Sequence, residues 1–249
     1  GYAYKSHGID HEFGGFVGVG GGSGPAVGVS AGGGVRGWAE PGCLCREREP
    51  AGFDRGTGER SSIFGAAFAN GELISALDFD AIPPPGHLSP YVLPGAMAVG
   101  EAQGASGKDL LNVIAMAHEM SYRIGKATDY LRDIKDGKVT PPKVYGYSST
   151  VFGATAAIAR LKGLSAERSA HALGIAGSIS PVNSHRAWSQ HVPSTTVKYL
   201  MAGVLAQTAL TAAHMGEMGH RGDLQTLDDP EFGFPRFIGT TRWEADNIL

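Results

Sequence analysis

The feature that most constrains this chain is a series of alanine-rich segments, from residue 61 onward, in which apolar side chains recur at helical spacing. The strongest segment, 106–129, follows a potential cap, Ser106, and carries a broad apolar stripe. The stripe consists of Leu110, Leu111, Ile114, Met116, Ala117, Met120 and Ile124. Strand patterns are few, and no internal repeat of solenoid length occurs. The sequence therefore predicts an all-α domain over residues 61–249.

The same periodicity predicts further helices, which we place at 61–80, 89–104, 149–163, 165–178 and 194–217. Ser61 or Ser62 can cap the first of these, and Ser165 can cap the fourth. Pro90 stands where the first turn of a helix tolerates proline. Small residues throughout 194–217 indicate close packing against a neighbouring helix.

Residues 1–60 have a different composition, because they hold 18 of the 38 glycines and show neither helical nor alternating periodicity. A phosphate-binding loop is not supported, since the lysine and hydroxyl of that motif are missing. Cys43 and Cys45 stand too close together for a disulfide and lack further zinc ligands, so we expect two reduced thiols. We therefore treat 1–60 as a glycine-rich, irregular segment that precedes the helical domain.

The overall charge excludes some classes of partner. A net charge of -3 gives no basic footprint for nucleic acid or for an anionic membrane surface. No uninterrupted apolar stretch has the length of a spanning helix, and the start of the sequence shows no secretion signal. We therefore expect an intracellular protein, cytoplasmic or mitochondrial, with no nucleic-acid or membrane partner.

A short loop between the first two predicted helices collects groups that can carry chemistry. Asp78 and Asp80 precede three consecutive prolines, 83–85, and His87 follows the flexible Gly86. Proline holds the chain extended, so an acid and an imidazole are presented from a stiff connection between helices. The alternative is a proline-rich connector in which these polar residues are incidental.

Lys198 is predicted to lie inside the helix 194–217, among apolar and small residues. Its ammonium group either extends to the surface along the helix or meets an anion at the mouth of a pocket. Just before this helix, Arg186 and His191 stand in a polar stretch that can form either an anion-binding edge or a solvated loop. The run 118–123 lacks the second histidine of a zinc protease, so Glu119 and Arg123 are interpreted as a helix ion pair.

Several of these motifs, in this order, resemble the MmgE/PrpD family, which includes 2-methylcitrate dehydratase, cis-aconitate decarboxylase and iminodisuccinate epimerase. The segments that carry the resemblance are "AAFANGELISALDFD", "GHLSPYVLPGAMAVGEAQGASGKDLL", "GATAAIARLKGLSAERSAHALGIAGS" and "VKYLMAG". The residues that fall on the family's pattern are Asn70, Gly71, Asp78, Phe79, Asp80, His87, Ser89, Glu119 and Arg123. The resemblance covers roughly residues 61–249.

The resemblance implies a helical domain, a homodimer, and action on small di- or tricarboxylates with no metal or organic cofactor. It implies catalytic roles for Asp78, His87 and Lys198, and we add Asp80, Arg186 and His191 as candidate substrate-binding residues. Such a set suits acid/base chemistry, because a cation holds a carboxylate while other groups move protons at neighbouring carbons. The reaction expected from it is the removal of water from a hydroxy-polycarboxylate like 2-methylcitrate.

The chain also departs from the family's pattern. Ala81 and Ile82 replace the second aspartate and the following threonine of the motif, and Ser148 replaces a histidine. We also expect that the family's smaller α+β domain is not contained in this chain, which appears as a truncated member. A decarboxylase or an epimerase of the same family remains an alternative, as does a helical domain without catalytic activity.

Overall fold

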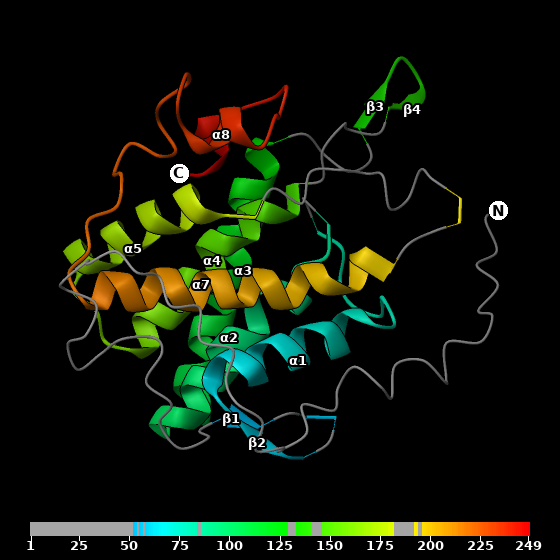
Figure 1. Cartoon of the computed structure of the whole chain (residues 1–249). Coiled ribbons are helices and arrows are strands. Elements are labelled where there is room, and N and C mark those ends of the chain that lie inside the picture. The colour runs from blue at the N-terminus through cyan, green and yellow to red at the C-terminus, as the bar shows by residue number, and fades with distance from the viewer. Residues whose placement is uncertain are drawn as a thin grey trace, which may run out of the picture. The chain divides into compact units, whose positions relative to one another are not determined.

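The computed structural model describes residues 52–53, 55–56, 58–83, 86–128, 133–140, 146–181, 192–193 and 196–249, all within one compact unit, Leu44–Leu249. Helices dominate these ranges (Figure 1). They are α1 (Ile63–Ser75), α2 (Ser89–Gln103), α3 (Gly107–Ala127), α4 (Thr150–Leu161), α5 (Ala166–Ile179), α7 (Met201–Glu217) and α8 (Phe234–Phe237). Short 3₁₀ turns are η2 (Gly146–Ser149), η3 (Thr196–Leu200) and η4 (Ala245–Asn247). The predicted all-α class is confirmed.

Three helices begin at the serine caps that the sequence indicates. Ser62 accepts a hydrogen bond from the Gly65 amide at 3.1 Å, which starts α1. Ser106 accepts from the Asp109 amide at 3.1 Å, and Ser165 accepts from the Arg168 amide at 3.3 Å. Each cap satisfies an amide that has no partner within its own helix, so these starts are determined locally.

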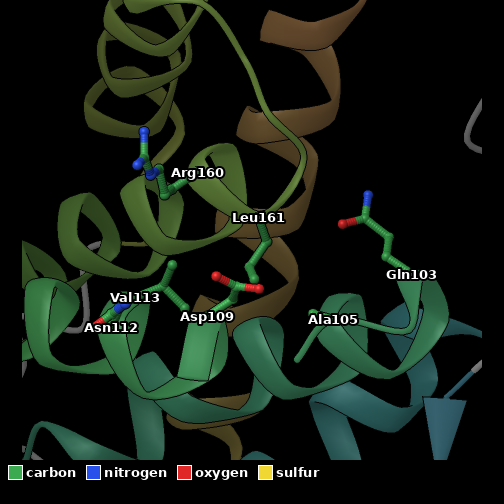
Figure 2. A pocket seen from close by; sticks show the side chains of 7 residues that line it. All are labelled: Gln103, Ala105, Asp109, Asn112, Val113, Arg160 and Leu161. Carbon is green, nitrogen blue, oxygen red and sulfur yellow. The ribbon is translucent and has the colours of Figure 1, made fainter. Parts of the chain in front are cut away.

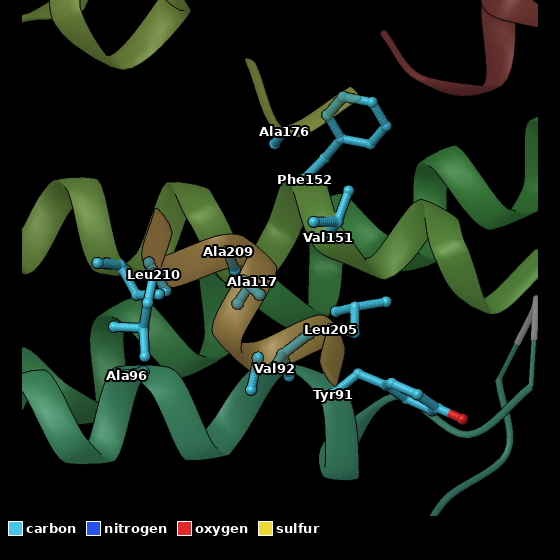
Figure 3. Close-up of a cluster of buried hydrophobic side chains, with 14 of the residues drawn as sticks. Tyr91, Val92, Ala96, Ala117, Val151, Phe152, Ala176, Leu205, Ala209 and Leu210 are labelled. Atoms are coloured by element: carbon cyan, nitrogen blue, oxygen red, sulfur yellow. The ribbon is translucent and has the colours of Figure 1, made fainter. Parts of the chain in front are cut away.

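The core lies around α4, which packs against α2, α3, α5 and α7. Small side chains at these contacts allow the helices to approach closely, and a few larger ones fill the remaining space (Figure 3). Phe152 of α4 is fully buried and meets Phe234 edge to face, with ring centroids 4.9 Å apart. Burial of such a side chain contributes about 2–3 kcal/mol.

Helices α1 and α7 cross with almost no space between their backbones. A Cβ atom on Gly71 would lie 3.1 Å from the backbone nitrogen of Gly203, and a Cβ on Gly203 would meet the Phe68 ring. Both positions therefore require glycine. This crossing brings the end of α1 beside η3, although the two segments are far apart in the sequence.

The start of α7 differs from the prediction. The sequence places Lys198 within a helix that begins near residue 194, whereas the structure places it in η3, and α7 begins at Met201. Thr196 and Val197 are β-branched and disfavour the α-helix, and the first turn of a helix often tightens to 3₁₀ geometry. Lys198 therefore precedes the long helix.

Two short hairpins were not predicted. Strand β1 (Gly52–Phe53) pairs with β2 (Arg60–Ser61), and β3 (Asp133–Lys135) pairs with β4 (Lys138–Thr140), both antiparallel. Asp136 and Gly137 both have positive φ, as a two-residue hairpin turn requires. The Asp-Gly dipeptide signals this turn in the sequence. In the described part of the chain, no helix is long and apolar enough to cross a membrane.

Candidate active site

The loop that joins α1 to α2 brings Asp78, Asp80 and His87 together. Asp78 has φ of 51°, a left-handed conformation that aspartate tolerates better than most residues, and its amide donates to the Ser75 carbonyl at 3.1 Å. The loop therefore turns sharply as soon as α1 ends. The proline run of the motif is only partly covered, because residues 84 and 85 lie outside the described ranges.

Asp80 and His87 form a buried pair. His87 Nδ1 lies 2.7 Å from Asp80 Oδ1, and the two side chains are 13% and 6% exposed. A carboxylate oxygen accepts, so in the neutral imidazole Nδ1 carries the proton and Nε2 has the lone pair. This geometry fixes the tautomer that a general base requires. The other oxygen of Asp80 is buried and has no hydrogen-bond partner within the described ranges.

Asp78 connects this pair to Lys198. The Lys198 ammonium group contacts Asp78 Oδ2, and His87 Nε2 lies 3.7 Å from Asp78 Oδ1. Lys198 is 14% exposed, so its charge meets an anion and does not extend into solvent. The anion that it meets is the Asp78 carboxylate of the same chain. Asp78, His87 and Lys198 thus converge across a separation of 120 residues.

Two stacked tyrosines lie next to His87, and Tyr147 is the one whose ring neighbours the imidazole. Tyr147 stacks on Tyr91 with ring centroids 5.5 Å apart, and its ring centroid lies 6.2 Å from that of His87. Gly86 lies directly against the Tyr147 ring, where a Cβ atom would clash. Burial raises the pKa of Tyr91 well above its usual value of 10, and negative charge on Tyr147 and nearby carboxylates adds to this. Tyr91 therefore remains a neutral phenol.

Glu72 is a residue that sequence reasoning missed. Its Oε1 accepts a hydrogen bond from the Gly203 amide at 2.6 Å, while its Oε2 is buried with no partner in the described ranges. Burial raises the pKa of Glu72 from 4.5 to about 7, although the hydrogen bond from Gly203 opposes the shift. The only signal in the sequence is an acidic residue in the middle of an otherwise apolar helix.

Other sequence-predicted residues have different outcomes. Arg186 and His191 lie outside the described residues, as do Cys43 and Cys45. Glu119 and Arg123 form the expected helix ion pair, with Oε1 and Nε 2.7 Å apart. Ser148 is buried, and its hydroxyl donates to the Pro181 carbonyl at 2.5 Å. The position at which the family carries a histidine therefore has a structural role here.

A separate cavity of about 260 Å³ lies where the end of α2 meets the start of α3 and the end of α4 (Figure 2). It is lined by Gln103, Ala105, Asp109, Asn112, Val113, Arg160 and Leu161. Since α2 rises about 1.5 Å per residue, this cavity is about 20 Å from the His87 end of the helix. The Asp109 carboxylate accepts a hydrogen bond at 2.6 Å from the hydroxyl of Ser106, which is the N-cap of α3. The cavity is therefore distinct from the Asp78–His87–Lys198 cluster.

Within the ranges the structure covers, no three His, Cys, Asp or Glu side chains are grouped so that they could hold a metal ion. The groups that are present instead form a chain of contacts from Asp80 through His87 and Asp78 to Lys198. A fixed imidazole beside a cation can move a proton next to a bound carboxylate.

The family model for the MmgE/PrpD N-terminal domain matches residues 54–245. The chain belongs to the MmgE/PrpD family. The match covers α1 to α7 and thus every described residue of the cluster, from Glu72 to Lys198. No curated protein matches the chain. Membership in the MmgE/PrpD family therefore rests on the N-terminal domain model, in agreement with the ordered motifs of the sequence.

Proposed function

We propose that this MmgE/PrpD protein is a lyase that removes water from a small hydroxy-polycarboxylate like 2-methylcitrate, with no metal or organic cofactor. The observation that carries the proposal is the convergence of a tautomer-fixed imidazole, His87, with the ammonium group of Lys198. The family's motifs support the same class of substrate.

In the proposed reaction, Lys198 holds a substrate carboxylate and stabilises the negative charge that develops when the neighbouring carbon loses a proton. His87 Nε2 takes that proton while Asp80 stabilises the resulting imidazolium. The carbon–oxygen bond then breaks, a carbon–carbon double bond forms, and His87 returns the proton to the departing hydroxide. Water leaves, and the imidazole is neutral again. Before substrate binds, Asp78 holds the Lys198 ammonium group beside His87. A substrate carboxylate then replaces the Asp78 carboxylate as the partner of that ammonium group.

A decarboxylase or an epimerase would use the same groups, since both need a bound carboxylate and a charge-stabilised carbanion. Which of these reactions takes place therefore depends on which substrate the site binds. We also expect a homodimer, as the family resemblance implies.

The second candidate is a helical domain without catalytic activity. The observation that favours it is Ser148, whose hydroxyl is bonded to Pro181 at the position where the family carries a second imidazole. Ala81 and Ile82 depart from the family's motif in the same loop. In that case Asp78 and Lys198 form a purely structural ion pair.

The test is a screen of the purified chain against citrate, 2-methylcitrate, cis-aconitate and iminodisuccinate, with products identified by NMR. We expect formation of an unsaturated acid from one of the two hydroxy acids. Decarboxylation of cis-aconitate would instead identify a decarboxylase of the same family, and epimerisation of iminodisuccinate would identify an epimerase. A folded protein that leaves all four unchanged would contradict catalysis and favour the second candidate.

A further inference from the structure

The position of Lys198 depends on how α7 begins, and α7 does not cap itself. Leu200 occupies the N-cap position and offers no side-chain acceptor. An acceptor from another segment can therefore bind an amide in its first turn. By contrast, α1, α3 and α5 each begin at a serine that supplies one.

Glu72 of α1 supplies that acceptor. Gly203 is the third residue of α7, and its amide donates to Glu72 Oε1 at 2.6 Å, the geometry of a side-chain cap. The carboxylate also lies at the positive end of the α7 dipole. Because residues 72 and 203 are 131 positions apart, this cap joins two distant segments and does not close a local turn.

The same two segments carry the ion pair of the candidate site. Asp78 lies one and a half helical turns beyond Glu72, just past the end of α1, and Lys198 lies in η3, which continues directly into α7. The Glu72–Gly203 hydrogen bond and the Asp78–Lys198 ion pair therefore join the same two segments at neighbouring positions.

We propose that Glu72 is a positioning residue, which caps α7 across the helix crossing and thereby holds Lys198 against Asp78. This role accounts for a carboxylate in a partly buried position, where its second oxygen has no partner in the described part of the chain. The inference rests on the proposed function only for its effect on turnover, because the position of Lys198 can be measured without a substrate.

The test is site-resolved acetylation of lysines, measured by mass spectrometry on the full chain. Lys162 is the internal reference, since it is 16% exposed and paired with Glu217, much as Lys198 is 14% exposed and paired with Asp78. We expect E72A to raise the reactivity of Lys198 relative to Lys162 by about tenfold, as the loss of one charge-assisted hydrogen bond would. E72Q retains an acceptor for the Gly203 amide and should restore a ratio within about twofold of the wild type.

E119A serves as a matched control, because it removes an exposed glutamate from α3 and leaves the crossing untouched. Its Lys198-to-Lys162 ratio should equal that of the wild type. An unchanged ratio in E72A, or an E72Q ratio as high as that of E72A, would overturn the proposal. If E72A does not fold, E72L replaces it, since leucine has a similar volume and no acceptor.

Amide exchange gives a second measurement. The Gly203 amide should exchange about tenfold faster in E72A than in the wild type, because the variant removes its acceptor, whereas E119A should leave the rate unchanged. Equal exchange of the Gly203 amide in E72A and the wild type would overturn the proposal. If the chain turns over a carboxylate, E72A should raise KM more than it lowers kcat, and E72Q should restore KM. A chain without turnover would count against the proposed function and leave both structural readouts intact.

Discussion

The helical core and the site edge, by which we mean Glu72, Asp78, Asp80, His87 and Lys198, bury different kinds of polar group. In the core, α3 starts at its own serine and buries an apolar stripe against α4. At the site edge, Asp78 adopts a left-handed conformation, and Asp80 and Glu72 each bury a carboxylate oxygen that has no partner in the described ranges. Two core hydroxyls, those of Ser121 and Thr155, are also buried with no partner in the described ranges, but a carboxylate costs more to bury than a hydroxyl. The buried carboxylates are therefore what distinguishes the site edge from the core.

The comparison also shows which contacts each region depends on. The caps of α1, α3 and α5 lie within three residues of the amides they bind. Two contacts of the site edge join residues 120 and 131 positions apart, although the Asp80–His87 contact spans only seven. Core substitutions should therefore mainly change the free energy of unfolding, whereas site-edge substitutions should also change chemistry, local geometry or the pH dependence of stability. Four predictions test this division, from the largest expected effect to the smallest.

H87A should lower turnover by about 10²–10⁴-fold, because it removes the general base. H87A also leaves the buried Asp80 carboxylate without its partner, so the unfolding midpoint should fall, and turnover is compared at a temperature at which the variant is folded. Steady-state kinetics and thermal unfolding measure the two effects. H220A is the matched control, since His220 is exposed and lies beyond the end of α7. Equal losses of turnover in both variants would remove His87 from the mechanism.

F152A should lower the free energy of unfolding by about 3–5 kcal/mol, because it leaves a cavity at the centre of the core. Urea titration followed by circular dichroism measures this. The Lys198-to-Lys162 acetylation ratio should not change under conditions where the variant is folded. A loss below about 1 kcal/mol would show that the core around α4 repacks freely.

E72Q should change how stability depends on pH. The pKa of Glu72 is raised from 4.5 to about 7, so the stability associated with its protonation is fully present below pH 4.5 and is lost as pH rises through 7. Glutamine does not titrate, so E72Q should gain stability relative to the wild type across this window. With allowance for solvent screening, the gain is on the order of 1 kcal/mol. Urea unfolding at pH 5 and pH 8 measures this. A difference in the free energy of unfolding between E72Q and the wild type that is the same at both pH values would contradict the raised pKa.

S106A should lower the free energy of unfolding by about 1 kcal/mol, through the loss of the α3 cap. The Asp109 amide should exchange faster, while the Gly203 amide should not. Hydrogen exchange followed by NMR separates the two sites. Faster exchange at Gly203 would show that the core and the site edge are not independent.

The same division explains what the sequence could predict. Helices α1, α3 and α5 were found with their caps because the signals lie within a few residues of each start. The β3–β4 hairpin was missed although its Asp-Gly turn was visible. Lys198 was placed inside a helix because the apolar pattern runs through residue 198, while the 3₁₀ start depends on β-branched residues and on contacts with α1.

The candidate site could be predicted only in part. Asp78, His87 and Lys198 came from the family's ordered motifs, and no periodicity in the chain links positions 120 residues apart. Asp80 was predicted to bind substrate, whereas its contact with His87 favours an orienting role, and the structure does not test substrate binding. Glu72 was missed because its significance arises from the Gly203 amide across the helix crossing.

The measurement that most directly tests the central claim is hydrogen–deuterium exchange at carbon, followed by NMR, with citrate or 2-methylcitrate in D₂O. If His87 takes a proton from the carbon beside a carboxylate held by Lys198, the wild-type chain should replace a proton on such a carbon of one of these acids by deuterium, because the reverse addition of D₂O delivers deuterium to that carbon. H87A should not, and H220A should match the wild type. Equal incorporation by the wild type and H87A, or none by a folded wild-type chain, would contradict the assignment of this cluster as an acid/base site.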